Sequence, residues 1–325
     1  MGYQITARIT LFVGLANWTL VAGAAMAAEC APPPPAVIDI DANGYYSNSN
    51  HSVIDPVQKA RNVANTRPIE DYLARIADDA SRYRFDPATG AADARCALAW
   101  LAAWADQGAM LGKLSTRQSY YVRKWTLAGL ALSYAKLRAA ASASQQAAID
   151  KWLRALADAT IEHSDAYKGA RNNHYYWEGL AVSAVGALTG DQRYLAWGRK
   201  VFEAAMAQVA ANGSLPLEMA RAIKALDYHA FAVTPLVMIA SILDLHSPKL
   251  DGLVRFTIAQ TKNPARIEQL TGFTQQIPGD AGMSWEVIYA RHEADPGFAP
   301  RTPGRQPRLG GDLLLANPLE HLAAR

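Results

Sequence analysis

The chain has 325 residues, of which 50% are hydrophobic and 19% are charged, and its formal net charge is +3. This is an ordinary globular composition with ample material for a core. The charge is too small to indicate a nucleic-acid partner, and the sequence contains no DNA- or RNA-binding motif. Alanine is very frequent, whereas valine and isoleucine are modest, which favours helices over strands.

Residues 1–27 are predicted to be a signal peptide. They carry one charge, on Arg8, followed by an apolar run and by the small-x-small pattern Ala25-Met26-Ala27 that is typical of a cleavage site. A membrane anchor and a lipoprotein modified at Cys30 are the alternatives. We expect a periplasmic or secreted protein that is not membrane-bound after cleavage. With 14 tyrosines and 8 tryptophans, such a mildly positive protein suits a polyanionic polysaccharide.

Cys30 and Cys96 are the two cysteines of the chain. Because export leads to an oxidising compartment, we expect them to form a disulfide, with two unpaired thiols as the alternative. The sequence contains no CxxC, HxxxH or HExxH pattern. It therefore predicts no metal site and no cofactor.

Residues 28–66 are predicted to form an N-terminal arm that leads into a loop. Four prolines, an Asn-Gly pair and the aromatic pair Tyr45-Tyr46 follow one another there, as expected of irregular structure. A lid over a cleft and a disordered connector are both consistent with this composition. Helical spacing begins at Thr66, which is a plausible N-cap, with Pro68 in the first turn.

Helical patterns then continue along the chain, separated by short Gly-, Asn- and Pro-containing breaks. The sequence shows no sustained alternation of apolar and polar residues, so it predicts no sheet. The pattern indicates an all-α protein of stacked antiparallel helical hairpins, forming either a solenoid or a toroid, in a single domain over residues 67–325. An extended tail, 296–318, closes the chain. The expected later helices cover residues 94–111, 119–137, 145–161, 173–188, 194–211, 217–226, 230–243, 253–260, 265–270 and 281–292.

Two short stretches are candidates for chemistry. The first, residues 172–177, places two carboxamides, an imidazole and three aromatic rings at the start of a predicted helix, a composition that suits a sugar-binding cleft. The second contains Arg221, Lys224 and Tyr228, spaced three and four residues apart, which would share one helical face. The alternatives are a satisfied structural His174 in the first stretch and a solvated face in the second.

Taken together, these stretches resemble the polysaccharide lyase family 5 alginate lyases. Further segments of the same family pattern lie around Cys96–Leu111 and in the sequences that include Ser284-Trp285 and Arg308–Asp312. The motifs that carry the resemblance are Asn172-Asn173-His174-x-Tyr176-Trp177, Leu215-Pro216-x-Glu218, Arg221, Ala225-Leu226-x-Tyr228-His229 and Arg123-Lys124-Trp125.

The resemblance implies an incomplete (α/α) toroid that cleaves mannuronate-rich alginate by β-elimination. It also implies a catalytic set of Asn173, His174, Arg221 and Tyr228. We expect a monomer whose partner is an anionic polysaccharide. The residues expected to bind substrate are Tyr45, Tyr46, Tyr121, Arg123, Trp125, Tyr176, Trp177, Lys224 and Trp285.

The chemistry of β-elimination requires such groups. Asn173 and Arg221 would neutralise the C6 carboxylate so that the C5 proton can leave, and Tyr228 would protonate the departing O4. In mannuronate these two atoms lie on one ring face, so one residue can serve both steps if its pKa is lowered, here by Arg221 and Lys224. His174 either accepts the C5 proton or helps to neutralise the carboxylate.

The sequence also departs from the family pattern. Apolar residues surround Arg221 where a denser basic run is usual, and Asp227 stands where a small residue is usual. A broader lyase that acts on polyglucuronate or hyaluronan-like chains is therefore an alternative. Two other classes remain, a glycoside hydrolase using two of Glu178, Glu218 and Asp227, and a non-catalytic polysaccharide-binding protein.

Overall fold

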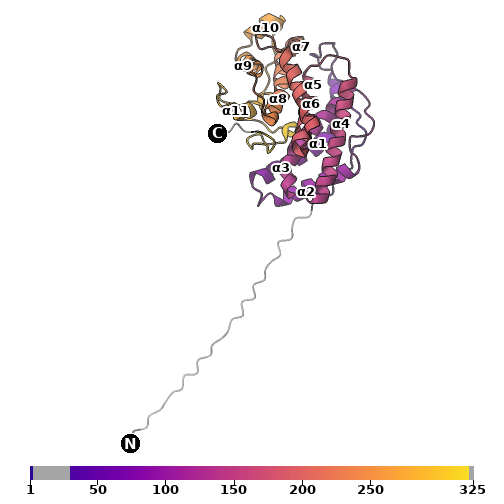
Figure 1. Ribbon diagram of the computed structural model, residues 1–325, viewed down its shortest axis with the longest axis vertical. Helices are drawn as coiled ribbons and strands as arrows, with labels where there is room; N and C mark the ends of the chain where they lie inside the picture. The colour runs from indigo at the N-terminus through magenta and orange to yellow at the C-terminus, as the bar shows by residue number, and fades with distance from the viewer. Residues whose placement is uncertain (3–29, 322–325) are drawn as a thin grey trace.

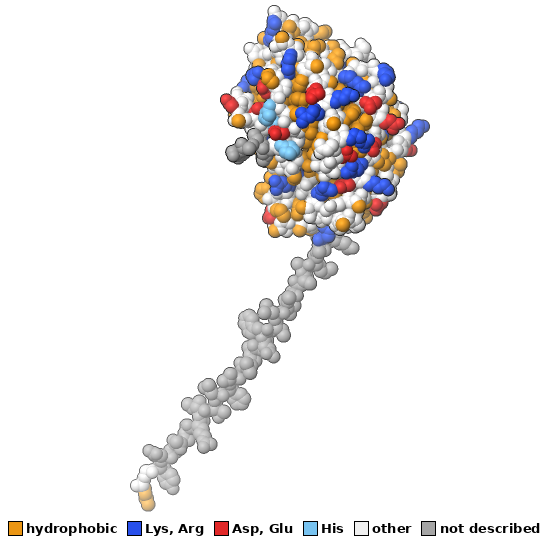
Figure 2. Space-filling model, in the orientation of Figure 1, with side chains coloured by type: hydrophobic (Ala, Val, Ile, Leu, Met, Phe, Trp, Pro, Cys, Tyr) orange, Lys and Arg blue, Asp and Glu red, His pale blue; other side chains and the backbone are white. Residues whose placement is uncertain are grey.

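The computed structural model describes residues 1–2 and 30–321 (Figure 1), so the predicted signal peptide lies almost entirely outside the described residues. The described chain is built from helices, with isolated β-bridges and no strands, which confirms the all-α prediction. Basic and acidic side chains are interspersed on the face shown in Figure 2.

The α-helices are α1 Pro56–Phe85, α2 Ala91–Asp106, α3 Arg117–Leu137, α4 Ala143–Ala166, α5 Asn173–Thr189, α6 Gln192–Gln208, α7 Pro216–Met219, α8 Ala225–Leu243, α9 Pro248–Lys262, α10 Ala265–Thr271 and α11 Glu286–His292. The 3₁₀-helices are η1 Arg138–Ala140, η2 Ala222–Lys224, η3 Asp280–Met283 and η4 Pro307–Leu309.

The long helices form two layers. Helices α1, α3, α5 and α8 pack one against the next, and each is followed by a partner, α2, α4, α6 or α9, that packs against it. This is the arrangement of an (α/α) toroid, in agreement with the prediction. Nearly every residue of α5 is buried, as expected of a helix enclosed by neighbours on all sides. The first turns of α5 therefore have fixed positions at one end of the inner layer.

Helix α8 is also a core helix. Segment Ala222–Leu243 is long and apolar enough to cross a membrane, but 78% of its apolar window is buried inside the protein. The side chains of Val233, Leu236, Val237 and Ile239 have no exposed surface. The hydrophobicity of this segment is thus explained by packing within the domain.

The first helix begins earlier than the sequence predicts. It starts at Pro56, and the side chain of Asp55 caps it by accepting hydrogen bonds from the N–H groups of Val57 and Gln58. Pro68 lies inside the helix, and Thr66 donates its hydroxyl proton to the Asn62 carbonyl instead of capping. The boundary predicted at residue 66 is therefore too late, because the cap at Asp55 was overlooked and Pro68 was placed in a first turn.

The predicted helix over residues 217–226 is interrupted. Helix α7 ends at Met219, η2 follows, and α8 begins at Ala225, with Ala222 in the left-handed region at φ 51°. Gln275 holds this break, since its amide donates to the Ala222 carbonyl (3.0 Å) and accepts from the Leu226 N–H (3.0 Å). Arg221, Lys224 and Tyr228 thus do not form a single helical stripe, because a side chain about fifty residues away stabilises the break.

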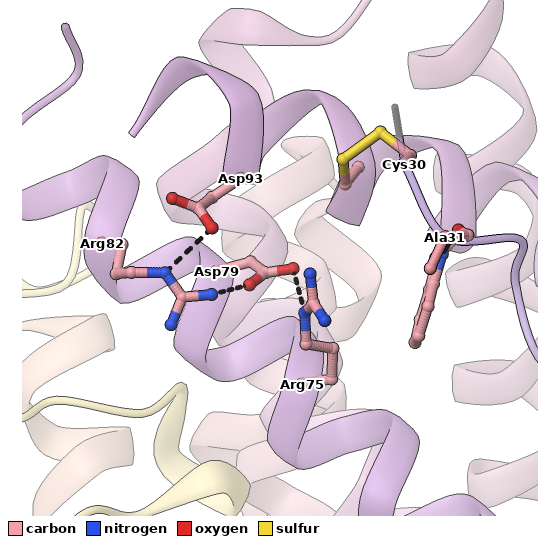
Figure 3. Close-up of a disulfide and its surroundings, with 8 residues drawn as sticks. Cys30, Ala31, Arg75, Asp79, Arg82 and Asp93 are labelled. Atoms are coloured by element: carbon pink, nitrogen blue, oxygen red, sulfur yellow. Dashed lines mark hydrogen bonds and ion pairs between the residues drawn. A yellow bond between two sulfur atoms is a disulfide. The ribbon is translucent and has the colours of Figure 1, made fainter. Parts of the chain in front are cut away.

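The N-terminal arm is attached to α2. The disulfide between Cys30 and Cys96 is formed, as expected, and Figure 3 shows it next to Arg75, Asp79 and Arg82 of α1. Further along the arm, the indole N–H groups of Trp100 and Trp104 donate to the carbonyls of Ala31 (2.8 Å) and Pro34 (3.0 Å). These contacts fix the path of the chain that leads to the Tyr45-Tyr46 segment.

Candidate active site

A cavity of about 540 Å³ lies at the end of the inner helix layer. Its walls come from the segment after the arm, from α3, from the start of α5, from α8 and from the C-terminal segment near η4. Of the residues predicted from the sequence, it brings together Tyr45, Tyr46, Tyr121, Trp125, His174, Trp177, Arg221, Tyr228 and Trp285. Basic residues that were not predicted also line it, namely His51, Arg117, His163, Arg171 and Arg308.

His174 is placed by the start of α5. Asn172 is the N-cap, and its side-chain oxygen accepts from the His174 N–H at 3.1 Å, so the imidazole lies in the first turn. The imidazole stacks on Tyr121, with ring centroids 3.5 Å apart. The Lys124 ammonium group donates to the His174 backbone carbonyl at 2.8 Å. The ring is therefore fixed in orientation, with part of its surface facing the cavity.

The environment of His174 favours its neutral form. Burial is the main cause that lowers its pKa well below the usual value, and the positive charges of Lys124 and Arg221 lower it further. Its Nδ1 atom has no hydrogen-bond partner in the described structure. At neutral pH the residue is thus an uncharged imidazole that is able to accept a proton.

A buried carboxylate joins two members of the predicted catalytic set. Glu218 is fully buried. One of its carboxylate oxygens accepts from the Asn173 backbone N–H (2.9 Å), and both oxygens accept from the Asn173 side-chain NH₂ group (3.0 Å each). Arg221 Nε lies 3.5 Å from the second carboxylate oxygen. Burial raises the pKa of Glu218, whereas Arg221 and Asn173 oppose the rise. The Asn173 NH₂ group is therefore committed to Glu218, while its Oδ1 has no hydrogen-bond partner in the described structure, and the side chain does not line the cavity.

Arg221 and Tyr228 line the cavity and contact the Tyr45–Asp55 segment. The Arg221 guanidinium lies 4.7 Å from the Tyr228 ring centroid and donates to His51 Nδ1 at 3.1 Å. The Tyr228 hydroxyl donates to the His51 carbonyl at 3.4 Å. Because arginine is only a donor, His51 accepts here and is neutral in this contact.

The pKa of Tyr228 is raised, not lowered as the sequence argument required. Burial is the largest cause, and the neighbouring Tyr46 phenol adds to it, while the Arg221 charge opposes it only in part. Lys224 points to Asp227 instead, with Nζ 3.5 Å from its carboxylate. The expected lowering is therefore wrong for this arrangement, since desolvation outweighs one nearby cation. The phenol is therefore protonated at neutral pH.

The segment Tyr45–Asp55 is a short hairpin that covers the cavity. Its two sides are joined by the backbone bonds Asp55 N–H to Tyr45 C=O (2.8 Å) and Ser47 N–H to Val53 C=O (3.0 Å). Asn48 accepts from two N–H groups at the tip, and His51 has a left-handed backbone at φ 56°. We refer to this hairpin as the lid.

Three predicted substrate-binding residues do not line the cavity. Arg123 is buried and donates to the Ala159 carbonyl at 2.8 Å. Tyr176 is also buried, and its hydroxyl donates to Gln208 at 3.1 Å. Lys224 pairs with Asp227. The structure thus places these side chains in supporting positions around the cavity, because their polar atoms are already satisfied by the protein.

A buried ion pair was missed by the motif analysis. Lys124 Nζ lies 3.0 Å from Glu178 and beneath His174, and burial lowers its pKa to about 8. With Glu178 bound to Lys124 and Glu218 bound to Asn173, two of the three carboxylates considered for a hydrolase are occupied. The geometry therefore gives no support to a pair of free catalytic carboxylates.

Comparisons with known proteins agree with this site. A family model described as alginate lyase matches residues 39–274. A polysaccharide lyase of Stenotrophomonas maltophilia strain K279a is 41% identical over 315 residues, which cover 91% of this chain and 93% of that protein. An alginate lyase of Azotobacter vinelandii is 33% identical over 247 residues, covering 69% of this chain and 66% of that protein.

Solved structures are similar over almost the whole chain. The crystal structure of alginate lyase A1-III from Sphingomonas species A1 has a TM-score of 0.70 at 25% identity, covering 90% of this chain and 87% of that chain. A His-to-Ala variant of A1-III complexed with a tetrasaccharide has a TM-score of 0.74 at 25% identity, covering 90% and 89%. The chain belongs to the alginate lyase family of polysaccharide lyases.

Proposed function

We propose that the protein is an exported lyase that cleaves poly-β-D-mannuronate by metal-independent β-elimination, leaving 4-deoxy-hex-4-enuronate ends. The observation that carries the proposal is the placement of Arg221, a neutral His174 and a protonated Tyr228 on one cavity. Two variants of alginate lyase A1-III, one Tyr-to-Phe and one His-to-Ala, hold a tetrasaccharide. These complexes support an oligosaccharide as the occupant of the corresponding cavity.

Charge neutralisation is the first requirement of the reaction. The C5 proton of a uronate becomes acidic only when the C6 carboxylate is neutralised, because an enolate-like dianion develops. Arg221 is the cation of the expected catalytic set that lines the cavity, and its Nε lies 3.5 Å from the Glu218 carboxylate. Asn173 acts in this scheme through Glu218, by positioning the α5 start and the guanidinium, and not by direct contact with the sugar.

Proton transfer is the second requirement. The C5–H bond breaks, its electron pair forms the C4–C5 double bond, the C4–O4 bond breaks and Tyr228 gives its proton to O4. Two groups are suited to receive the C5 proton. One is the neutral imidazole of His174, and the other is Tyr228 as a phenolate, which takes the C5 proton and then gives it to O4 on the same ring face. The two assignments predict different pH profiles.

The pH dependence of kcat/KM separates these assignments. If His174 is the base, its lowered pKa leaves it active well below pH 6.5, and the rate is flat through neutral pH. If the Tyr228 phenolate is the base, its raised pKa makes the rate climb with pH into the alkaline range. The profile is measured by the ultraviolet absorbance of the unsaturated product.

Variants test the proposal directly. Tyr228→Phe and His174→Ala are each expected to lower kcat/KM on polymannuronate by roughly 10²- to 10⁴-fold, the usual contribution of a positioned acid or base. Circular dichroism controls for folding. Full activity in either variant contradicts the assignment, as does a loss of turnover in EDTA that calcium restores.

A broader polyuronate substrate is the second candidate, and Asp227 is the observation that favours it. This carboxylate lines the cavity and is 45% exposed. Glucuronate differs from mannuronate only in the configuration at C2, so a hydrogen bond from the C2 hydroxyl to Asp227 would distinguish the two sugars. Rates on polymannuronate, polyglucuronate, hyaluronan and polyguluronate rank the substrates. Under this candidate, Asp227→Ala shifts the ratio of rates towards polymannuronate. An unchanged ratio argues against it.

Export is proposed from the pattern of residues 1–27, and the Cys30–Cys96 disulfide supports it. Expression of the full chain followed by cell fractionation tests this. The processed protein is expected in the periplasm or medium, with both cysteines unreactive towards a thiol reagent. Full-length protein in the cytoplasm with free thiols contradicts the proposal.

A further inference from the structure

A second cluster of ionisable side chains lies outside the cavity, where two helices end. Asp244 is the C-cap of α8 with φ 51°, and His246 follows in the turn before α9. His292 is the last residue of α11, and Glu293 is its C-cap. One ligand atom from each of Asp244, His246 and His292 lies within 4.8 Å of the others. Nothing in the β-elimination scheme uses these residues.

Both imidazoles have one ring nitrogen engaged by an acceptor. His246 Nδ1 lies 3.0 Å from the Glu293 carboxylate, and His292 Nε2 lies 3.0 Å from the Leu245 carbonyl. Carbonyls and ionised carboxylates only accept hydrogen bonds, so these nitrogens carry the protons. The other nitrogen of each ring is left with a lone pair. Metal-binding histidines show this arrangement, in which an oxygen acceptor fixes the ring and its tautomer.

The spacing and exposure also suit a bound cation. His246 Nε2 is 3.7 Å from Asp244 Oδ1, and two ligands of a tetrahedral zinc ion at ~2.0–2.1 Å are about 3.3 Å apart. His292 is fully buried, and its Nδ1 has no hydrogen-bond partner in the described structure. Asp244 and His246 are 62% and 53% exposed, which leaves an entry path from solvent. The two rings stack with their centroids 4.5 Å apart, so His246, which is exposed, has to turn out of the stack for both lone pairs to reach one ion.

We propose that Asp244, His246 and His292 bind a divalent transition-metal ion of the zinc type, with water completing the coordination. Two imidazoles and one carboxylate select such an ion over magnesium or calcium, which require oxygen ligands. Glu293 is the positioning residue, since its Oε1 faces both His246 Nδ1 (3.0 Å) and His292 Nε2 (3.7 Å). The sequence conceals the site, because its two histidines are 46 positions apart.

The location indicates a structural role. The ion would fasten the end of α11 to the turn between α8 and α9. Helix α11 is about 10 Å long at ~1.5 Å per residue, and Trp285, which lines the cavity, directly precedes it. Zinc binding therefore raises the Tm of the protein without entering the reaction, because an ion that binds the folded state stabilises it by mass action.

The test uses the whole protein after treatment with chelator. Titration calorimetry with Zn²⁺ is expected to show one tight equivalent and a higher Tm, whereas Mg²⁺ and Ca²⁺ produce neither. His246→Ala and Asp244→Asn should abolish the tight equivalent, and Glu293→Gln should weaken it roughly 10- to 100-fold. His321→Ala, which removes another exposed histidine, is the matched control and should bind zinc like the wild type.

Two results would overturn the proposal. One is the absence of a stoichiometric zinc site in the wild type, and the other is equal zinc affinity in wild type and His246→Ala. His292→Ala is not the primary variant, because the buried ring also packs and its loss lowers stability by itself. Turnover on polymannuronate is measured alongside and is expected to be the same with and without zinc, so the outcome is independent of the catalytic scheme.

Discussion

The two walls of the cavity are built differently. The wall formed by α5 and the α7–α8 break is held by buried charges: Glu218 joins Asn173 and Arg221, and Lys124 joins Glu178 beneath His174. The lid is an exposed hairpin closed by its own backbone bonds, and His51 joins it to Arg221 and Tyr228 by hydrogen bonds. Because the first wall is held by buried pairs and the lid by exposed hydrogen bonds, we expect the lid to open at lower cost than the first wall.

Removal of Glu218 should have the largest effect. Glu218→Ala leaves the Asn173 amide and one side of Arg221 without a partner in a fully buried position. Breaking a buried pair in this way costs about 3–5 kcal/mol, and we expect kcat/KM to fall together with the free energy of unfolding. Urea denaturation and the ultraviolet assay measure the two losses.

Glu218→Gln is the matched control, since it keeps the shape of the side chain and one acceptor. It should be less destabilising than the alanine variant. An alanine variant with unchanged unfolding free energy would show that this wall is not held by Glu218.

Loss of the disulfide should have the next largest effect, on stability and not on chemistry. The bond closes a loop with a sequence separation of 66, and removal of a disulfide typically costs about 2–4 kcal/mol. We expect Cys30→Ser combined with Cys96→Ser to lower the Tm and leave kcat nearly unchanged. A large fall in kcat would instead mean that the arm positions the lid during turnover.

The lid contact itself should have a smaller effect. His51→Ala removes the acceptor of one Arg221 hydrogen bond, a contact with a net value of about 1 kcal/mol. We expect KM to rise several-fold while the Tm stays unchanged. Val53→Ala, a truncation at an exposed lid position, is the control. If both variants behave alike, the His51 contact has no special role.

The smallest effect should be a pH dependence of lid closure. Burial and then the Arg221 charge lower the pKa of His51 below its usual value of 6.5. Closure therefore favours the neutral ring, is fully supported above pH 6.5 and weakens as the pH falls below it. Limited proteolysis within the lid should become faster between pH 7 and 5, and His51→Gln should remove this dependence.

Much of the site was predictable because its motifs are local. The Asn172 cap and His174 are adjacent in sequence, and the cap alone places the imidazole in the first turn of α5. Helix order followed from apolar spacing, and the disulfide followed from the presence of two cysteines in a chain expected to be exported. In each case the decisive interaction is close in sequence or leaves few alternatives.

The predictions from sequence were wrong where contacts with residues distant in the sequence determine the local structure or the pKa. The break at Ala222 depends on Gln275, and the commitment of the Asn173 amide depends on Glu218. The raised pKa of Tyr228 depends on burial by the lid, which no spacing within residues 221–228 reveals. Such effects require the three-dimensional packing, because desolvation and long-range hydrogen bonds have no periodic signature in the sequence.

The carboxylate of Glu218 also constrains how this sequence can drift. Replacing Glu218 leaves the Asn173 NH₂ group without its acceptor, replacing Asn173 removes the side-chain donor of both Glu218 oxygens, and replacing Arg221 removes the cation that pairs with the buried carboxylate. Each single substitution among these three residues is therefore expected to lower the stability of the protein. We expect relatives to keep all three residues or to replace them together, so that the trio is inherited as a single unit.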